Sequence, residues 1–416
     1  MLPVRKKEGK QMKKLIIAGV VLLLAVLGLI VFTGNDSPLA KKPTTEEAPA
    51  PSATETPLDG EPEEAEEVEN VTVDYAAIYA LHDPDEIVMT VNGKEIPWKD
   101  YFYFYYSEAS QMDNQFAMYQ SYGYDLGWNS QADEDGRTYA DMLGEFAEDS
   151  LRQFLTMEEL AEQNQVVLSE EKEAELQQNH EENIAYFCGE EGTEEDFYAY
   201  LDSIYLSPEL YWRLIRANVL YEETFRQLYG EDGADLPEED VLAWMEDNGI
   251  VSANHILIGT MDLSTGEELE EAVVAEKTAL AQEIAQELQA IEDTEERIAR
   301  FLELKEQYCE DGGDYVFGPG VMVQEFYDGA LALEENEVSD PIQSQYGFHI
   351  ILRRPLNADD EIYSSGGANN TGRVSAANEL FGKKLQEVED AQVISYADGF
   401  TAPSIKDFLS VSTETA

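Results

Sequence analysis

An uninterrupted apolar run near the N-terminus constrains this chain more than any other feature. Residues 15–32 are all aliphatic, Gly or Phe, and a helix of that length can cross the hydrocarbon core of a bilayer. The basic residues of segment 1–14 should stay in the cytoplasm. The pattern predicts a cytoplasmic N-terminus (1–14), one transmembrane signal anchor (15–32) and extracytoplasmic folded domains. A cleaved signal peptide is the alternative, with a weak cleavage candidate at 37–40, although its apolar region is normally shorter.

The segment that follows the apolar run has the composition of a linker. Between residues 34 and 70 it consists mostly of Pro, Thr, Ala and Glu, with hardly an aromatic or branched apolar residue. Such a segment cannot bury enough apolar surface to offset the entropy lost on ordering. We therefore expect residues 33–84 to form a disordered, acidic stalk between the membrane and the folded part.

The charge balance narrows the choice of partners. The chain has 26 basic and 87 acidic residues, a formal net charge of −61. This charge repels phosphate backbones, so nucleic acid is not an expected partner. An acidic surface keeps a protein soluble, and it could also attract basic segments of unfolded clients.

Two cysteines, Cys188 and Cys309, are present in the chain. Neither has the spacing of a zinc site or a thiol redox motif, and they could pair in one disulfide. We expect no metal and no cofactor.

Residues 85–249 have the pattern of a mainly helical domain. It opens with a strand at 87–91 that ends in the turn Asn92-Gly93, and helical periodicity or start signals follow. The aromatic run 101–106 cannot face one side of a helix, so it either packs against other helices or stays exposed for clients. The further helices are expected at 139–164, 169–186, from 193, at 208–228 and after 237.

Residues 250–356 change to a mixed α+β pattern. A branched, alternating strand at 252–258 precedes two helical stretches, a Gly-rich loop, a helix near 324–333 and a strand at 348–353. A polar loop (357–373), a helical segment (374–400) and a tail (401–416) follow. Helical sequence on both sides of the α+β unit suggests one helical domain built from two separated pieces.

Four segments of the α+β unit occur in the order and approximate spacing of parvulin-type peptidyl-prolyl isomerases. These segments are Ala253–Ile258, Phe317–Phe326, Glu337–Ile342 and Tyr346–Ile351. The helical part looks like the chaperone domains of SurA- and PrsA-type foldases. The resemblance implies an α+β fold, in which a parvulin domain (a small antiparallel sheet with surrounding helices) is inserted into a mainly α-helical SurA-N-like chaperone domain, preceded by one transmembrane helix.

The resemblance also implies roles for individual residues. The catalytic group would be His255, Asp311, His349 and Ser344, and the substrate-binding group would be Met322, Phe326, Val323 and Phe317. The loop 311–316 is shorter than in the family and lacks its usual leucine. With a shifted register, the Cys309 thiol would take the acidic position instead.

The resemblance implies a peptidyl-prolyl cis-trans isomerase and chaperone that assists secreted or cell-surface proteins outside the cytoplasmic membrane. Its partners would be unfolded or partly folded polypeptides with X-Pro bonds, and it would be anchored as a single-pass membrane protein. No basic cluster follows His255, so phosphorylated substrates are not implied. A non-catalytic holdase with a degenerate parvulin domain is the main alternative, and a surface structural protein is a third reading.

Overall fold

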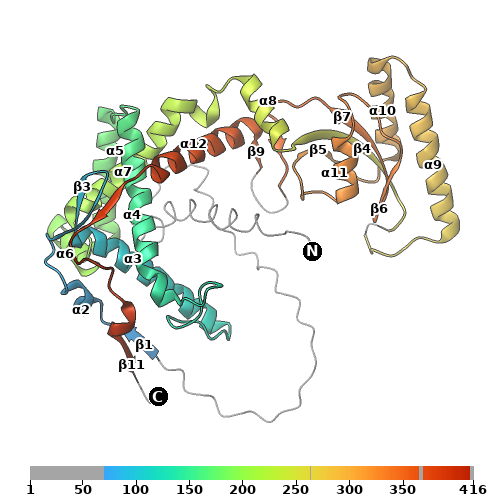
Figure 1. Cartoon of the computed structure of the whole chain (residues 1–416). Coiled ribbons are helices and arrows are strands. Elements are labelled where there is room, and N and C mark those ends of the chain that lie inside the picture. The colour runs from blue at the N-terminus through green and yellow to red at the C-terminus, as the bar shows by residue number, and fades with distance from the viewer. Residues whose placement is uncertain (1–69, 263, 365–368, 413–416) are drawn as a thin grey trace, which may run out of the picture. The chain divides into compact units, whose positions relative to one another are not determined.

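The structure is a computed structural model that describes residues 70–262, 264–364 and 369–412 (Figure 1). The predicted anchor at 15–32 and most of the predicted stalk lie outside these residues. Within the described part of the chain, no helix is long and apolar enough to cross a membrane. The chain divides into two compact units: the first holds residues up to Thr224 and from Lys384 onward, and the second spans Phe225–Lys383.

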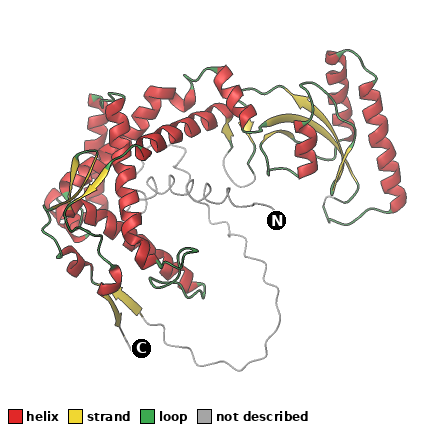
Figure 2. Cartoon of the chain, in the orientation of Figure 1, coloured by secondary structure: helices red, strands yellow, loops and turns green. Residues whose placement is uncertain are grey.

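The first unit is mainly helical, as the sequence predicts (Figure 2). Its helices are α2 (Tyr75–Tyr79), α3 (Trp98–Ser121), α4 (Tyr139–Gln163), α5 (Glu170–Cys188), α6 (Glu194–Ser203), most of α7 (Pro208–Tyr229) and the short η2 (Ile405–Phe408). A three-stranded antiparallel sheet has the order β10 (Ile394–Tyr396), β2 (Ile87–Val91), β3 (Lys94–Pro97). Asn92 and Gly93 both have positive φ, 50° and 79°, which the tight turn between β2 and β3 requires. The predicted strand and turn are therefore confirmed.

The aromatic run in α3 forms the core of the first unit. The five residues from Tyr101 to Tyr105 are each at most 2% exposed. They belong to one apolar cluster with residues of α2, α4, α6 and α7, so the helix is covered on several sides. Core packing, rather than an exposed client surface, accounts for this run.

Two terminal segments are ordered where the sequence predicted a stalk and a tail. Strand β1 (Asn70–Val73) pairs in antiparallel register with β11 (Leu409–Ser412), and Ile78 and Ile405 are fully buried. The prediction of disorder was therefore wrong for residues 70–84, and the tail 401–416 is structured as far as residue 412. Their apolar residues are too sparse for a local pattern to predict order. Each segment is instead ordered by pairing with a strand that lies more than 300 residues away in the sequence.

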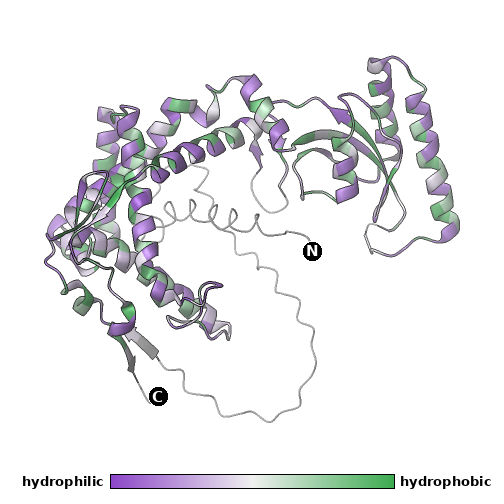
Figure 3. Ribbon diagram, viewed as in Figure 1, coloured by the Kyte–Doolittle hydropathy of each residue, from purple (hydrophilic) through white to green (hydrophobic). Residues whose placement is uncertain are grey.

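The second unit contains an antiparallel sheet with the strand order β5 (Asp314–Phe317), β4 (Val251–Gly259), β7 (Gly347–Arg354), β6 (Ile342–Ser344). Successive side chains of a strand alternate between the two faces. On one face, Ile256 and Ile350 pack with α9 (Glu271–Gln289) and α10 (Thr294–Tyr308). On the other face, Ala253 and Ile351 pack with α11 (Gln324–Leu331). The α+β fold with a small antiparallel sheet is confirmed, and Figure 3 shows the apolar character of its central strands.

The remaining elements of the second unit lie before and after this sheet in sequence. They are η1 (Glu231–Gly233), α8 (Glu238–Asp247), β8 (Glu361–Ile362), β9 (Asn370–Thr371) and the first part of α12 (Gly372–Asp390). The predicted loop 357–373 thus contains a paired hairpin. Helix α12 crosses a unit boundary, because its residues up to Lys383 cluster with the second unit. Ala376 of this helix packs with Met245 of α8. Cys188 and Cys309 are both free thiols.

Candidate functional site

The two predicted histidines lie together on the central strands of the sheet. Leu257 of β4 pairs with His349 of β7, and His255 pairs with Ile351. The histidines are therefore diagonal neighbours on the face that α11 covers. Their Nδ1 atoms are 3.4 Å apart, and the residues are 3% and 4% exposed.

Ser344 fixes the orientation of the histidine pair. Its Oγ accepts a hydrogen bond from the backbone N–H of Tyr346 at 3.1 Å and lies 2.7 Å from Nε2 of His349. Two opposite proton assignments satisfy these contacts, and the one that directs an N–H of His255 toward the Asp311 carboxylate has the hydroxyl donate to Nε2 of His349, whose Nδ1–H donates to Nδ1 of His255. In this assignment, Nε2 of His255 carries a proton and faces outward from the pair.

Asp311 is the group that meets this outward nitrogen. Its Oδ2 lies 3.2 Å from Nε2 of His255, but the geometry is not that of a hydrogen bond, and this buried nitrogen has no other partner. The Asp311 side chain is 39% exposed, against 4% for the His255 side chain. Asp311 thus stands between the buried pair and solvent.

The thiol of Cys309 contacts backbone atoms. Its Sγ lies 2.5 Å from the carbonyl oxygen of Asp311 and 3.4 Å from that of His255, and it accepts from the N–H of Leu257 at 3.3 Å. Burial raises the pKa of this thiol, which favours the uncharged form. The geometry therefore places the Asp311 carboxylate beside the histidine ring, whereas the thiol braces the start of the loop.

The predicted apolar residues surround the histidines from the side of α11. The Phe326 ring lies 4.9 Å from the His255 ring and 5.2 Å from the His349 ring, measured between centroids. It stacks on Phe317 at 5.3 Å with an angle of 17°. Met322 and Val323 are partly buried against the same cluster. Phe326, only 2% exposed, forms the floor of this group, and Met322 and Val323 lie nearer its surface.

The hairpin between β6 and β7 depends on one glycine. Gly347 has φ of 142°, and a Cβ atom there would lie 2.2 Å from the carbonyl oxygen of Ile258. Only glycine allows this approach of the two backbones. The hairpin in turn sets Ser344 opposite Gly347 and Ile342 opposite His349.

Burial keeps the histidines uncharged near neutral pH. Desolvation and the neighbouring His255 lower the pKa of His349 to about 4. Desolvation also lowers the pKa of His255, although Asp311 opposes this shift. Two neutral imidazoles can share the single hydrogen bond described above, whereas two imidazolium ions would repel one another.

The low pKa of His349 predicts a loss of stability on acidification. An unfolded histidine has a pKa of about 6.5, so between about pH 6.5 and about pH 4 the unfolded chain binds a proton that the folded chain does not. The free energy of unfolding should therefore fall as the pH falls through this window. At about 1.4 kcal/mol per pKa unit, the loss is about 3 kcal/mol by pH 4.

The measurement is hydrogen–deuterium exchange of the β4 and β7 amides between pH 7 and pH 4, corrected for intrinsic exchange, in the wild type and His349→Gln. The variant lacks the titrating group, so its stability should decline less steeply, while the many carboxylates affect both chains alike. Parallel curves for the two proteins would contradict the assignment.

Two tyrosines that sequence analysis missed adjoin the site. The hydroxyl of Tyr315 donates to Oδ1 of Asp311 at 3.2 Å, and its ring lies 5.8 Å from the His255 ring. The Tyr363 ring lies 5.7 Å from that of Tyr315. Tyr315 lies in β5, within the segment 311–316 that was expected to form a loop, and the absence of the family's leucine from that segment was a usable signal. No local pattern marked Tyr363.

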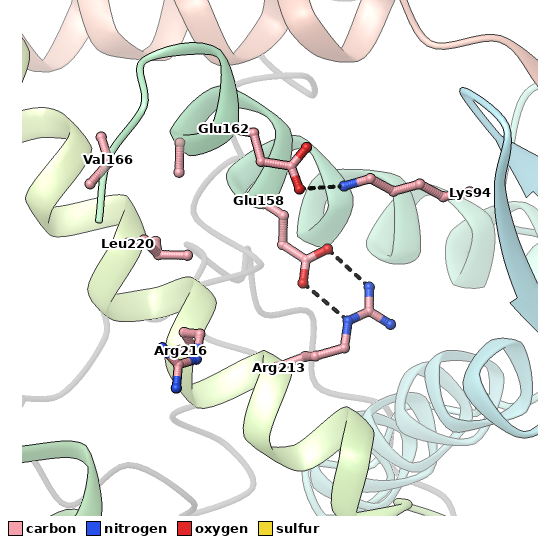
Figure 4. A pocket seen from close by; sticks show the side chains of 8 residues that line it. Lys94, Glu158, Glu162, Val166, Arg213, Arg216 and Leu220 are labelled. Carbon is pink, nitrogen blue, oxygen red and sulfur yellow. Dashed lines mark hydrogen bonds and ion pairs between the residues drawn. The ribbon is translucent and has the colours of Figure 1, made fainter. Parts of the chain in front are cut away.

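A separate cavity of about 410 Å³ lies in the first unit between α4 and α7 (Figure 4). Its three cations are already paired: Lys94 with Glu162, Arg213 in a two-pronged contact with Glu158, and Arg216 with Glu173. Its other lining residues are Ala161, Val166 and Leu220. We interpret this cavity as a groove between helices, and ion pairs connect the helices across it. None of the predicted site residues lines it, and in the described residues no cluster of His, Cys, Asp and Glu is suited to a metal ion.

Comparisons with known proteins agree with the geometry of the second unit. Residues 255–354 match the family described as Rotamase, PPIC-type PPIASE domain. The foldase protein PrsA of Oceanobacillus iheyensis is 30% identical over 233 residues, which cover 54% of this chain and 64% of that protein. The chaperone SurA of Methylococcus capsulatus is 30% identical over 142 residues, which cover 32% of this chain and 26% of that protein.

A further relative and a solved structure are matched over a larger share of their own lengths than the two proteins above. The foldase protein PrsA of Caldanaerobacter subterraneus is 28% identical over 274 residues, or 64% of this chain and 72% of that protein. The crystal structure of the peptidylprolyl isomerase PrsA from Bacillus anthracis aligns at 22% identity with a TM-score of 0.22, covering 57% of this chain and 94% of that one.

These matches cover only part of the first relatives. The match to the Oceanobacillus protein spans 64% of that relative, and a match to PrsA 4 of Bacillus cereus spans 26% of it. The family match, residues 255–354, lies within the second unit, where the paired histidines, the aromatic floor and the antiparallel sheet occur together. Residues 255–354 form a parvulin-type, PPIC-class rotamase domain within a chain that is similar to PrsA- and SurA-type foldases.

Proposed function

We propose that this chain is a peptidyl-prolyl cis-trans isomerase and chaperone that assists the folding of secreted or cell-surface proteins. The observation that carries the proposal is the buried pair His255–His349, with the Phe326 ring within 5.2 Å of both rings and the Asp311 carboxylate 3.2 Å from one. The family match over residues 255–354 supports the same activity. The substrates would be unfolded or partly folded chains that contain X-Pro bonds.

The site suits a rotation that needs no nucleophile and no metal. Rotation about an X-Pro bond must overcome a barrier of roughly 18–20 kcal/mol that arises from amide resonance. The planar amide carries charge separation, which is lost as the bond twists. A pocket that fits the proline ring and favours the twisted amide therefore lowers the barrier. Phe326 and Phe317 supply the apolar floor, and Met322 and Val323 would contact the proline ring from nearer the surface.

Asp311 is assigned an electrostatic role. Placed near the carbonyl oxygen of the rotating bond, its negative charge disfavours the planar form, in which that oxygen is most negative. The neutral histidine pair, fixed by Ser344, holds the floor of the pocket in shape. Cys309 would support the loop that presents Asp311.

We further propose that residues 15–32 anchor the chain in the cytoplasmic membrane and that the two described units lie outside it. The apolar run and the basic residues before it support this orientation. The first unit, which the chain forms from residues up to Thr224 and from Lys384 onward, would bind unfolded clients as a chaperone, with the parvulin domain inserted in the sequence between these two pieces. A protease-protection assay on intact cells tests the orientation, because protection of the epitope-tagged C-terminus from added protease would contradict it.

Replacing Asp311 tests the electrostatic role. We expect Asp311→Asn to lower kcat/KM for a proline-containing tetrapeptide by about 100-fold, the order of effect that removing one preorganised electrostatic group usually has. Folding should change little, because the carboxylate is 39% exposed and an asparagine can still accept from Tyr315. The assay is NMR exchange spectroscopy on the full-length chain, with Cys309→Ala as the control for the alternative position. Unchanged catalysis by Asp311→Asn with a loss in Cys309→Ala would reverse the assignment.

The holdase alternative requires a second assay on the same protein. Suppression of aggregation of a denatured client, without isomerisation of any tetrapeptide, would establish a non-catalytic chaperone. Absence of both activities would contradict the proposed function as a whole.

A further inference from the structure

An aromatic residue from beyond the matched domain reaches the edge of the candidate active site. Tyr363 follows strand β8 and lies outside the family match, which ends at residue 354. Its backbone N–H donates to the carbonyl oxygen of Val316 at 2.6 Å, so the strand that carries Tyr315 also holds Tyr363. The two rings meet at 5.7 Å with an angle of 63°, and Tyr363 remains 39% exposed.

The loop before β5 is built to hold the first of these rings. A Cβ atom on Gly313 would lie 1.7 Å from Cζ of Tyr315, so the ring lies across a backbone that only glycine leaves open. The Tyr315 hydroxyl donates to Asp311, and burial together with that carboxylate raises the pKa of Tyr315 to about 12. Tyr315 therefore remains a neutral donor over the physiological range.

Asp311 is the uncompensated charge of this group. Among the described residues, no Lys or Arg lies within ion-pair distance of the Asp311 carboxylate. The nearby cations pair with other carboxylates: Lys305 with Asp314, and Lys277 with Glu310. Its one close charged-group neighbour is His255, whose lowered pKa leaves that ring neutral. A half-exposed carboxylate and two tyrosine rings therefore form one surface next to the paired histidines.

We propose that Asp311, Tyr315 and Tyr363 form a subsite for a basic side chain, Lys or Arg, on the residue that precedes the substrate's proline. The proposal rests on the proposed function, in which Asp311 faces the carbonyl oxygen of the rotating bond. That carbonyl belongs to the preceding residue, whose Cα is within about 3.8 Å of the proline Cα. Its side chain therefore leaves the backbone beside the carboxylate and the rings.

The chemistry of the subsite selects for positive charge. A cation gains from a carboxylate at close range and from the faces of tyrosine rings. An acidic side chain would meet only like charge there, since the neighbouring basic residues are already paired. The net charge of −61 acts in the same direction, because it draws cationic segments toward the whole chain.

The experiment measures isomerisation of three tetrapeptides, Ala-Lys-Pro-Phe, Ala-Ala-Pro-Phe and Ala-Glu-Pro-Phe, by NMR exchange spectroscopy with the full-length chain. We expect kcat/KM to be about five- to tenfold higher with Lys than with Ala, and lowest with Glu. Tyr363→Leu, which keeps the bulk but removes the ring, should lower the Lys-to-Ala ratio at least about threefold. Tyr363→Phe should retain the ratio, because its ring still attracts a cation.

A matched control removes an exposed tyrosine elsewhere. Tyr186 is 68% exposed and lies in the first unit, so Tyr186→Ala should leave the Lys-to-Ala ratio as in the wild type. The proposal is overturned if the wild type does not prefer Lys, or if Tyr363→Leu keeps the full preference. High salt should reduce the preference, because screening weakens the carboxylate's contribution.

Failure of the proposed function gives a different result. If no peptide is isomerised, the catalytic assignment falls, and the affinities of the same peptides for wild type and Tyr363→Leu decide the subsite. Tighter binding of the Lys peptide that Tyr363→Leu abolishes would uphold the subsite in a non-catalytic domain. Equal affinities for all three peptides would overturn it.

Discussion

Phe326→Ala is expected to abolish proline isomerisation and to destabilise the second unit by about 3–5 kcal/mol. The side chain is 2% exposed, and its ring contacts Phe317 and both histidines of the pair. Removing it leaves a cavity under the proline site and allows the histidine rings to move. Activity would be followed by NMR exchange with an alanyl-proline tetrapeptide, and stability by hydrogen exchange of the β4 and β7 amides.

A matched substitution separates the loss of activity from the loss of stability. Phe301 of α10 is fully buried on the opposite face of the same sheet, so Phe301→Ala should cost a similar free energy while the histidine face keeps its contacts. At a temperature where both variants remain folded, Phe301→Ala should retain activity and Phe326→Ala should not. Equal activity in the two variants would show that Phe326 is a core residue without a role at the site.

The central part of the site was predictable because short-range patterns specify it. The alternation of branched residues around His255 and His349 assigns each histidine to one face of a strand. Antiparallel pairing of those strands then brings the two rings within 5.4 Å. Phe326 lies in α11, which covers the same face, whereas Met322 lies just before this helix begins.

The edge of the site was not predictable, because pairing between distant segments creates it. Tyr363 reaches Tyr315 through a hairpin that follows the domain, and its sequence surroundings are polar. The pairing of β1 with β11 is of the same kind, since neither strand has a strong apolar pattern of its own. Local periodicity reports which face of an element is buried, but not which remote segment covers that face.

Trp98→Ala is the second substitution with a large expected effect, because this residue joins the ordered terminal segments to the core of the first unit. Trp98 is fully buried, its ring lies 5.2 Å from Phe102 and 6.3 Å from Phe400, and its Nε1–H donates to the carbonyl oxygen of Tyr79 at 2.8 Å. We expect a loss of about 3–5 kcal/mol in the free energy of unfolding of this unit, increased by the unpaired Tyr79 carbonyl.

Hydrogen exchange by segment distinguishes a local from a global effect of this substitution. The amides of β1 and β11 should lose protection together with those of α3, because Trp98 contacts elements from both ends of the folded chain. Trp98→Phe keeps an aromatic ring but lacks the N–H, so it should cost less and leave α3 protected while exchange near Tyr79 rises. If β1 and β11 stayed protected in Trp98→Ala while α3 exchanged, the terminal strands would be stabilised by their own pairing rather than by the aromatic core.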